Sequence, residues 1–297
     1  MGWFSFLMSH WVRPYLPAQF AGCRLHGLNF EGDPGRYATG RARFLDAEEK
    51  AYKRHLAHLA MDVDTASAGS AMDRLSRIYD CILIDEVQDL NGYDLEVLDA
   101  LINAQIELRL VGDVRQATLF TNPQDPKNKQ YKGIKIKTWF EDQEKAGRLS
   151  IDHQNQTWRS NQAIADFADS VFDPSWGFAK TKSANTAVTG HDGVFQLAQV
   201  DVMAYVEQFD PLCLRSSAAT AKEIDLPFST FGSAKGMEAE RVLIWPTGPI
   251  MDFIKRGKEL KPLSSCALYV AITRARSSVA VVVPKPVECD LPLWSPD

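Results

Sequence analysis

The sequence predicts an α/β protein whose strands form parallel sheets. Short apolar runs alternate along the chain with segments whose apolar residues recur at helical spacing. Several of the apolar runs end abruptly in acidic or polar residues. The carboxyl ends of strands in open parallel sheets are where such proteins bind ligands. With 297 residues, 45% of them hydrophobic, the chain is long enough for one or two domains with substantial cores.

Charge and cysteine content limit the class of protein. The net charge of -5 gives no overall attraction to nucleic acid, so any such contact requires a local basic patch. The five cysteines are odd in number and widely spaced, without a C-x-x-C pair. This pattern argues against a disulfide framework and against a zinc site. We therefore expect a cytoplasmic protein.

The first element is an apolar segment over residues 2–8. It lacks a basic leading region and soon meets His10, Arg13 and Pro14, so it predicts neither a signal peptide nor a membrane span. We expect a core helix here. Because no strand or cap precedes this helix, we also expect the chain to begin inside a domain.

The next elements are a loop and a helix. Residues 16–40 are rich in Gly and Pro and predict irregular structure. Residues 46–61 begin with Asp, then carry acids and later bases, which predicts a helix. His55 and His58 on this segment could ligate a metal, but without a third ligand surface histidines are the better interpretation. A small-residue linker and a turn, residues 66–77, follow.

The central feature is the run 79–90, apolar through Ile84 and then acidic. It predicts a buried strand that feeds a charged loop. In such a loop Asp85 can hold Mg²⁺ while Glu86 orients or deprotonates a water that attacks a γ-phosphate. The alternative is a capped surface turn. Gln88 and Asp89, which follow directly, favour the functional interpretation.

A crossover helix over residues 94–104 and a second short strand over 108–111 follow. The strand ends in Gly112 and Asp113. Gln116 lies three residues after that acid, so its amide can bind the same phosphate or water as Glu86. Taken alone, Gly-Asp is only a turn.

A lysine-rich stretch ends the first half of the chain. Its lysines interleave with Tyr131 and lead to Trp139 and Phe140, a pattern typical of a single-strand platform. A solvated lysine loop explains the pattern equally well. The lysines are Lys127, Lys129, Lys132, Lys135 and Lys137.

In the second half, strands and helices continue to alternate. Trp158 and Arg159 stand at the entrance of the first helix and offer a stacking surface and a forked cation. The last helix carries two arginines on its polar edge, and residues 284–297 read as a Pro-rich tail. Helices are predicted over 161–171, 203–208 and 266–276, and strands over 193–198, 211–215, 241–245 and 279–283.

Five segments, in this order, resemble motifs II to VI of UvrD/Rep-type superfamily 1 DNA helicases. The resemblance extends from residue 2 to residue 283. It implies two RecA-like parallel-sheet domains, residues 1–148 (incomplete) and 149–283, which clamp ATP and Mg²⁺ and step along single-stranded DNA. The segments are Asp85-Glu86-Val87-Gln88-Asp89, Gly112-Asp113-x-x-Gln116, Trp158-Arg159-Ser160, Ala234-Lys235-Gly236-Met237-Glu238 and Leu268-Tyr269-Val270-Ala271-Ile272-Thr273-Arg274-Ala275-Arg276.

The resemblance also implies roles for single residues. Asp85 would hold Mg²⁺, Glu86 would be the catalytic base, and Gln116 would couple the γ-phosphate to DNA. The remaining roles belong to the second domain: Trp158 would stack on adenine, Arg159 and Arg274 would be arginine fingers, Glu238 would contact the ribose, and Thr230 and Lys235 would contact DNA.

The departures from the family concern phosphate and DNA binding. No G-x-x-x-x-G-K-[ST] occurs in the sequence, so we expect little ATP turnover by this chain alone, and we expect the phosphate loop to lie upstream of residue 1. Gly232 replaces the family's DNA-contacting histidine. About seventy residues separate Arg159 from Thr230, too few for the large 2B insertion.

Two hypotheses of different class follow. The first is a compact ATP-dependent DNA helicase or translocase that lacks its phosphate loop. Small helicases of this kind resemble the helicase-like subunits found with OLD-family nucleases in phage defence, so a protein partner is expected. The second is a non-catalytic DNA- or partner-binding module that keeps the fold. The intact set of acids and arginines favours the first.

Overall fold

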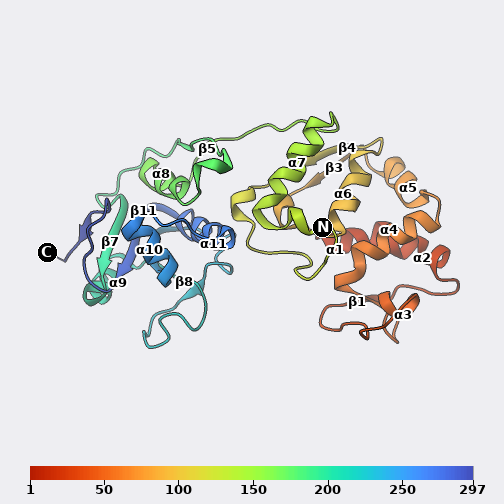
Figure 1. The fold of residues 1–297 in the computed structure, drawn as a ribbon, viewed down its shortest axis with the longest axis horizontal. Helices are drawn as coiled ribbons and strands as arrows, with labels where there is room; N and C mark the ends of the chain where they lie inside the picture. Colours follow the sequence, from red (N-terminus) through yellow and green to blue (C-terminus); the bar gives the residue numbers. More distant parts are fainter. Residues whose placement is uncertain (297) are drawn as a thin grey trace. The chain divides into compact units, whose positions relative to one another are not determined.

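The computed structural model describes residues 1–296, and their contacts divide them into two compact units. Unit 1 comprises Met1–Val114 and Phe120–Ile151. Unit 2 comprises Arg115–Leu119 and the chain from Asp152 onward. Each unit is described by itself, with the labels of Figure 1. Within residues 1–296, no helix combines the length and the apolar character needed to cross a bilayer.

The expected N-terminal core helix is confirmed. It runs through α1 (Trp3–Phe6), a π-helical segment η1 (Leu7–Val12) and α2 (Arg13–Gln19). Leu7, Trp11 and Leu16 on it are fully buried in the core of unit 1. Their spacing of four or five residues keeps the apolar side chains on one face, which packs on α4 (Leu56–Ala66).

The helix predicted over residues 46–61 is wrong in its first half. Residues Lys50–Tyr52 form β2, which pairs in parallel with β1 (Gly27–Asn29), a strand inside the stretch expected to be irregular. Asp46 does not cap a helix. Its Oδ1 accepts the backbone N–H groups of Glu48 (3.0 Å) and Lys50 (2.9 Å), which closes a turn before the strand.

The two histidines of this region are packed rather than free on the surface. The ring of His58 stacks on Tyr93 with 3.9 Å between centroids. Burial, and then the nearby Arg54 and Arg43, lower the pKa of His55 to about 4. Among residues 1–296, no group of three or more His, Cys, Asp or Glu side chains is arranged to hold a metal ion.

The strands of unit 1 follow the prediction, and the segment before them does not. The expected linker and turn over residues 66–77 contain α5 (Ser70–Ile78). After it, β3 (Cys81–Ile84) pairs in parallel with β4 (Glu107–Leu110), and α6 (Asp94–Ile102) connects them. The remaining helices of this unit are α3 (Arg41–Phe44) and α7 (Ile136–Lys145).

The expectation that the first strand is buried holds for one face only. Ile82 and Ile84 face the core, where Leu108 and Leu110 of β4 join them. Leu83 points the other way and is 70% exposed. The reason is that this sheet has only two hydrogen-bonded strands, and the helices of unit 1 pack on one of its faces.

Substitutions at neighbouring residues of β3 should therefore change the free energy of unfolding by different amounts. Ile82→Ala should lower the free energy of unfolding by about 2–4 kcal/mol, because it leaves a cavity in the core. Leu83→Ala, the matched control on the open face, should change it by about 0.5 kcal/mol or less. Chemical denaturation of both variants measures the difference, and equal losses would show that the outer face is covered.

A buried carboxylate ties the N-terminal helix to α6. Trp3 Nε1 donates to Asp94 Oδ1 at 2.6 Å, and Thr121 Oγ1 donates to Asp94 Oδ2. Asp94 is 2% exposed, and burial raises its pKa to about 6. The carboxylate is thus held by hydrogen bonds at a cost in desolvation.

The raised pKa predicts a pH dependence of stability. Between about pH 4 and 6 the folded chain binds the Asp94 proton that the unfolded chain has lost, so stability falls as pH rises through this range and is flat above it. The change is at most about 3 kcal/mol. Asp94→Asn should flatten this part of a denaturation-against-pH profile. An unchanged slope in the variant would assign the effect to another group.

Unit 2 contains a six-stranded parallel sheet in the order β12-β7-β11-β10-β8-β9. Helices α8 (Gln162–Ser170) and α11 (Pro262–Ile272) pack on each other and on the sheet (Figure 1). The strands are β7 (Gly193–Ala198), β8 (Leu212–Arg215), β9 (Ser229–Thr230), β10 (Ala239–Trp245), β11 (Ala275–Val283) and β12 (Leu293–Trp294), and the other helices are α9 (Val202–Phe209) and α10 (Gly248–Arg256).

The central strand of this sheet is buried on both faces. Val279, Ala280 and Val281 are all fully buried, although successive side chains point to opposite faces. This is the apolar pattern of a parallel sheet covered on both sides. The predicted α/β class with parallel sheets is confirmed, and residues 160–229 fold within unit 2 without a further domain.

Two details of unit 2 differ from the prediction. The segment 284–297, expected to be a tail, contributes β12, and its Trp294 packs on Tyr205 at 5.0 Å between ring centroids. The last helix ends at Ile272, so Arg274 follows it and Arg276 lies in β11. All five cysteines are free thiols.

Candidate functional site

The acidic turn of unit 1 directly follows β3. Asp85 and Glu86 are both exposed there, and Glu86 has a positive φ of 56°. Asp85 Oδ1 accepts the backbone N–H of Glu86 at 2.8 Å. Such a conformation is uncommon for a residue with a side chain, and this hydrogen bond stabilises it.

Gln88 holds this turn against the loop that follows β4. Gln88 is 1% exposed; its Nε2 donates to Glu86 Oε2, and its Oε1 accepts the backbone N–H of Asp113 at 3.2 Å. A Cβ on Gly112 would lie 2.3 Å from Gln88 Oε1, so a larger residue there would displace the Gln88 amide. This role of Gln88 was not predicted. The signal was available as an amide between acids in one loop and a Gly-Asp pair in the other.

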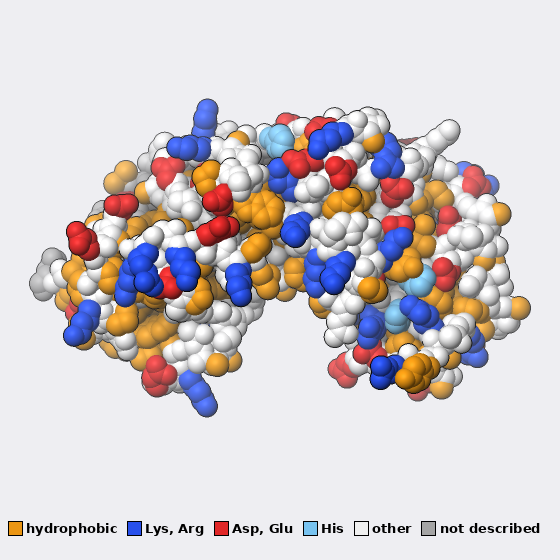
Figure 2. All heavy atoms as spheres, in the orientation of Figure 1, with side chains coloured by type: hydrophobic (Ala, Val, Ile, Leu, Met, Phe, Trp, Pro, Cys, Tyr) orange, Lys and Arg blue, Asp and Glu red, His pale blue; other side chains and the backbone are white. Residues whose placement is uncertain are grey.

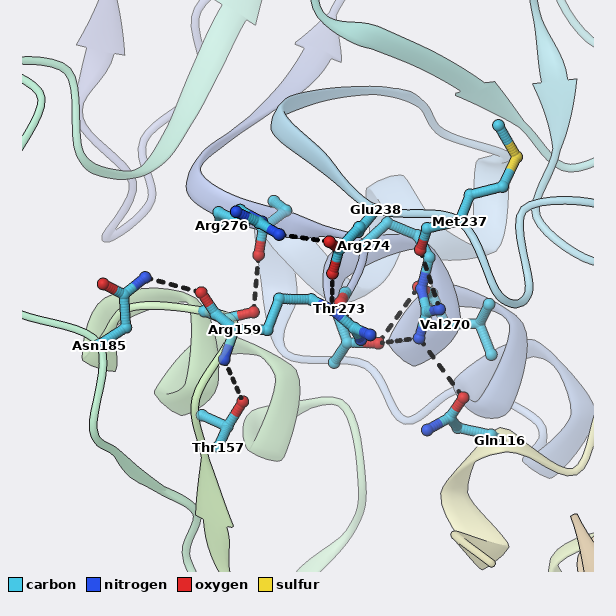
Figure 3. Close-up of polar contacts among 12 residues, drawn as sticks. Gln116, Thr157, Arg159, Asn185, Met237, Glu238, Val270, Thr273, Arg274 and Arg276 are labelled. Carbon is cyan, nitrogen blue, oxygen red and sulfur yellow. Dashed lines mark hydrogen bonds and ion pairs between the residues drawn. The ribbon is translucent and has the colours of Figure 1, made fainter. Parts of the chain in front are cut away.

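Unit 2 brings together residues from four of the predicted motifs (Figure 3). Arg159 Nε donates to Glu238 Oε2 at 3.1 Å, and Arg276 Nη2 donates to Glu238 Oε1. Arg159 Nη1 also donates to the carbonyl of Thr273 at 3.3 Å. The Arg276 and Arg159 guanidiniums hold the pKa of Glu238 below its usual range. Glu238 therefore remains ionised between two cations.

Arg274 occupies the buried side of this cluster. It is 2% exposed, and its guanidinium donates to the carbonyls of Val270 (2.9 Å) and Met237 (3.2 Å). Its Nη2 donates to Thr273 Oγ1 at 3.2 Å and to Gln116 Oε1 at 3.4 Å. The buried cation is thus solvated by protein oxygens in place of water.

Hydrogen bonds to β11 explain why segments so distant in sequence meet. Ser160 Oγ donates to the carbonyl of Ala275 at 2.6 Å, and Asn161 Nδ2 donates to that of Ser277 at 2.7 Å. Asn161 Oδ1 also accepts the N–H of Ile164 at 3.1 Å, which caps α8. The residues after Arg159 are therefore fixed to the strand that follows Arg274.

Trp158, beside this cluster in sequence, is 77% exposed. An indole left in solvent offers a flat face on which a base can stack.

The lysine-rich stretch lies in unit 1, and its aromatic residues are not available for stacking. Trp139 is 5% exposed and belongs to the core, and Tyr131 packs against that core while its hydroxyl donates to Asp142 at 3.3 Å. Lys127 pairs with Glu96 at 3.3 Å. Figure 2 shows acidic and basic side chains interspersed on the face in view. The structure therefore favours a lysine-bearing loop over a platform of stacked rings. Of its lysines, Lys132 is half-buried over Phe120, and Lys129 and Lys135 are exposed.

The predicted DNA-contacting segment of unit 2 is a tight turn. Thr230 Oγ1 donates to Ser233 Oγ at 2.9 Å, and the N–H of Ser233 donates to Thr230 Oγ1 at 3.2 Å. Gly236 has a φ of 84°, which requires glycine, and Lys235 before it is half-buried.

One protein-family model matches part of unit 1. Residues 44–119, which include α4, β3 and β4, match the model of the UvrD/REP helicase N-terminal domain. This part of the chain is similar to the N-terminal domain of UvrD/REP helicases. A search of curated proteins finds no match to it.

Solved helicase structures resemble this chain only distantly. A PRRSV helicase structure is 18% identical, with a TM-score of 0.41, and the match covers 68% of this chain and 34% of that one. Arterivirus nonstructural protein 10 (helicase) is 17% identical, with a TM-score of 0.43, over 68% and 38%. Its complex with DNA is 16% identical, with a TM-score of 0.41, over 68% and 39%. The chain thus matches less than half the length of each.

The two arginines after α11 should respond differently to substitution. Arg274→Lys should destabilise the chain by about 2 kcal/mol or more, because an ammonium cannot reach all the buried oxygens to which the guanidinium donates. Arg276→Lys, the control, should cost about 0.5 kcal/mol or less, since its side chain is 51% exposed. Denaturant unfolding compares them. Equal losses would contradict the buried role of Arg274.

Proposed function

We propose that this chain supplies the motor elements of an ATP-dependent DNA helicase or translocase of the UvrD type. One observation carries the proposal. Gln116, Arg159, Glu238 and Arg274, each expected to serve ATP binding or hydrolysis, form one hydrogen-bonded cluster in unit 2 (Figure 3). The match of residues 44–119 to the UvrD/REP helicase N-terminal domain supports it.

In unit 1, Asp85 and Glu86 fit a magnesium and water site. Their carboxylates are exposed at the carboxyl end of a parallel strand and are of the type that Mg²⁺ prefers. Asp85 would hold Mg²⁺ there. Glu86, kept in place by Gln88, would orient or deprotonate the attacking water.

In unit 2, the arginines fit a phosphate. Bound MgATP would supply the phosphoryl group, and two guanidinium forks would neutralise the charge that develops on it. Glu238 is the counter-ion of Arg159 here, so a phosphate would compete with a carboxylate for the same guanidinium. Gln116 would sense the γ-phosphate, and Trp158 would stack on the adenine.

We further propose that these 297 residues alone turn over little ATP. The printed sequence holds no G-x-x-x-x-G-K-[ST], and such a loop provides the backbone N–H groups and the lysine that cradle the phosphates. DNA contact is proposed for Lys127, Lys129, Lys132 and Lys135 of unit 1, beside Tyr131, and for Thr230 and Lys235 of unit 2.

The test is nucleotide binding and turnover by the 297-residue chain. We expect background ATPase activity, with or without single-stranded DNA, and weak binding of a fluorescent ATP analogue with Mg²⁺. Arg159→Ala should weaken that binding about tenfold, equivalent to about 1.4 kcal/mol. Arg256→Ala, which removes an exposed ion pair with Asp252 in the same unit, is the matched control.

The other outcomes are equally informative. Robust turnover that Glu86→Gln abolishes would show that the chain needs no further phosphate loop. Absence of both nucleotide and single-stranded DNA binding would favour a non-catalytic module and contradict the proposed function.

A further inference from the structure

The side chain of Arg115, the residue before Gln116, packs among Asp169, Thr181, Phe178 and Tyr269 of unit 2. We call this site the socket. Arg115 Nη1 donates to Asp169 Oδ1 at 3.0 Å and to Thr181 Oγ1 at 3.3 Å. The side chains of Arg115 and Asp169 are only 16% and 18% exposed. By contrast, the exposed pair Arg256–Asp252 has an arginine whose side chain is 68% exposed. The Arg115 pair is therefore much less open to solvent than an ordinary surface ion pair.

Asp169, the acidic residue of the socket, is held in place by Thr181. Thr181 donates twice to Asp169: its backbone N–H reaches Oδ2 at 2.6 Å, and its hydroxyl reaches Oδ1 at 2.9 Å. These two hydrogen bonds orient the Asp169 carboxylate on α8 without any contribution from Arg115. A preorganised carboxylate binds a guanidinium without losing further side-chain freedom.

The other wall is aromatic. The Arg115 guanidinium carbon lies 4.6 Å from the ring centroid of Tyr269 on α11 and 5.8 Å from that of Phe178. Phe172 contacts both rings, at 5.4 Å from Tyr269 and 5.3 Å from Phe178. A planar guanidinium can stack on such rings while it donates sideways to a carboxylate, whereas a lysine ammonium cannot do both.

This socket determines where the next residue lies. Gln116 Oε1 accepts from Arg274, which follows the same helix that carries Tyr269. Ala117 is 1% exposed. Residues Arg115–Leu119 consequently belong to unit 2, although the strand before them, β4, belongs to unit 1.

The socket also connects to Arg159. Thr181 immediately precedes β6 (Lys182–Ser183), and Ser183 Oγ donates to the carbonyl of Ser160 at 2.8 Å. Asn185 Nδ2 donates to the carbonyl of Arg159 at 2.6 Å (Figure 3). One short segment thus contacts both the carboxylate that holds Arg115 and the backbone of Arg159.

We propose that Arg115 is a positioning residue. Its contacts with Asp169 and Tyr269 place the Gln116 amide beside Arg274 and fix it relative to Arg159. The chemical part of this inference rests on the proposed function, in which Gln116 responds to the γ-phosphate. The anchoring part does not, because it concerns the chain without a ligand.

The experiment is amide hydrogen exchange of the whole chain, read on the peptide that contains residues 115–119. Arg115→Lys keeps the charge but loses the planar fork, and Asp169→Asn keeps the size but loses the carboxylate. Without a ligand, both should raise the exchange rate of this peptide at least about tenfold, equivalent to about 1.4 kcal/mol of local stability. Arg256→Lys, the control pair on α10, should leave it unchanged.

A second measurement adds Mg²⁺ and the slowly hydrolysed analogue ATPγS. The original chain should gain protection in this peptide, and both socket variants should gain at least about fivefold less. A structural role alone would shift the ligand-free rate but not this difference. Equal gains would overturn the positioning role.

The two proposals fail separately. If the ligand-free exchange is the same in all variants, Arg115 does not anchor the segment and the inference is overturned. If the anchor is confirmed and ATPγS protects no peptide of the original chain, the nucleotide-binding part of the proposed function fails, and the positioning of Gln116 for nucleotide fails with it. If Arg115→Lys does not fold, Asp169→Asn decides alone.

Discussion

The hydrogen bonds from Ser160 and Asn161 to the backbone of β11 are the constraint on which the cluster in unit 2 depends. They fix the residues after Arg159 to the strand that begins just after Arg274. Without this connection, the guanidiniums and Glu238 would belong to separate loops. With it, a single carboxylate lies between Arg159 and Arg276, directly before β10 and beside the first residues of β11. The rigid sheet thus sets the spacing of the charged groups.

The charged groups of unit 2 have two distinct environments. Arg274 is enclosed by carbonyl and side-chain oxygens, whereas Arg159 and Arg276 are partly open to water. A buried guanidinium cannot move without leaving its oxygen partners unpaired, while an exposed one can exchange a carboxylate for a phosphate at small cost. Arg274 is therefore suited to act as a fixed cation, and Arg159 as a cation that can exchange its partner. In unit 1, Gln88 has the corresponding fixed role, because its amide binds both Glu86 and the loop that contains Gly112.

The errors in the predicted elements have identifiable causes. Residues 46–61 carry a helical charge pattern, yet the pairing of β2 with β1 outweighs it. Trp139 follows a lysine-rich loop and looked available for stacking, but the helical phase of α7 directs it into the core. The Pro-rich segment 284–297 gave no strand signal, since β12 contributes only two residues and is defined by its neighbour β7. In each case a contact distant in sequence decided the outcome.

The sequence by itself determined the α/β class, the strands that carry the motifs, and the residue types of the candidate site, because apolar runs and polar strand ends are local properties. Only the tertiary structure decided which charges pair with one another. Three sets of contacts join residues far apart in sequence. Arg115 contacts Asp169 and Tyr269, Gln88 binds the backbone of Asp113, and Glu238 lies between two arginines. No local pattern encodes such partners, since they are set by how helices and strands pack.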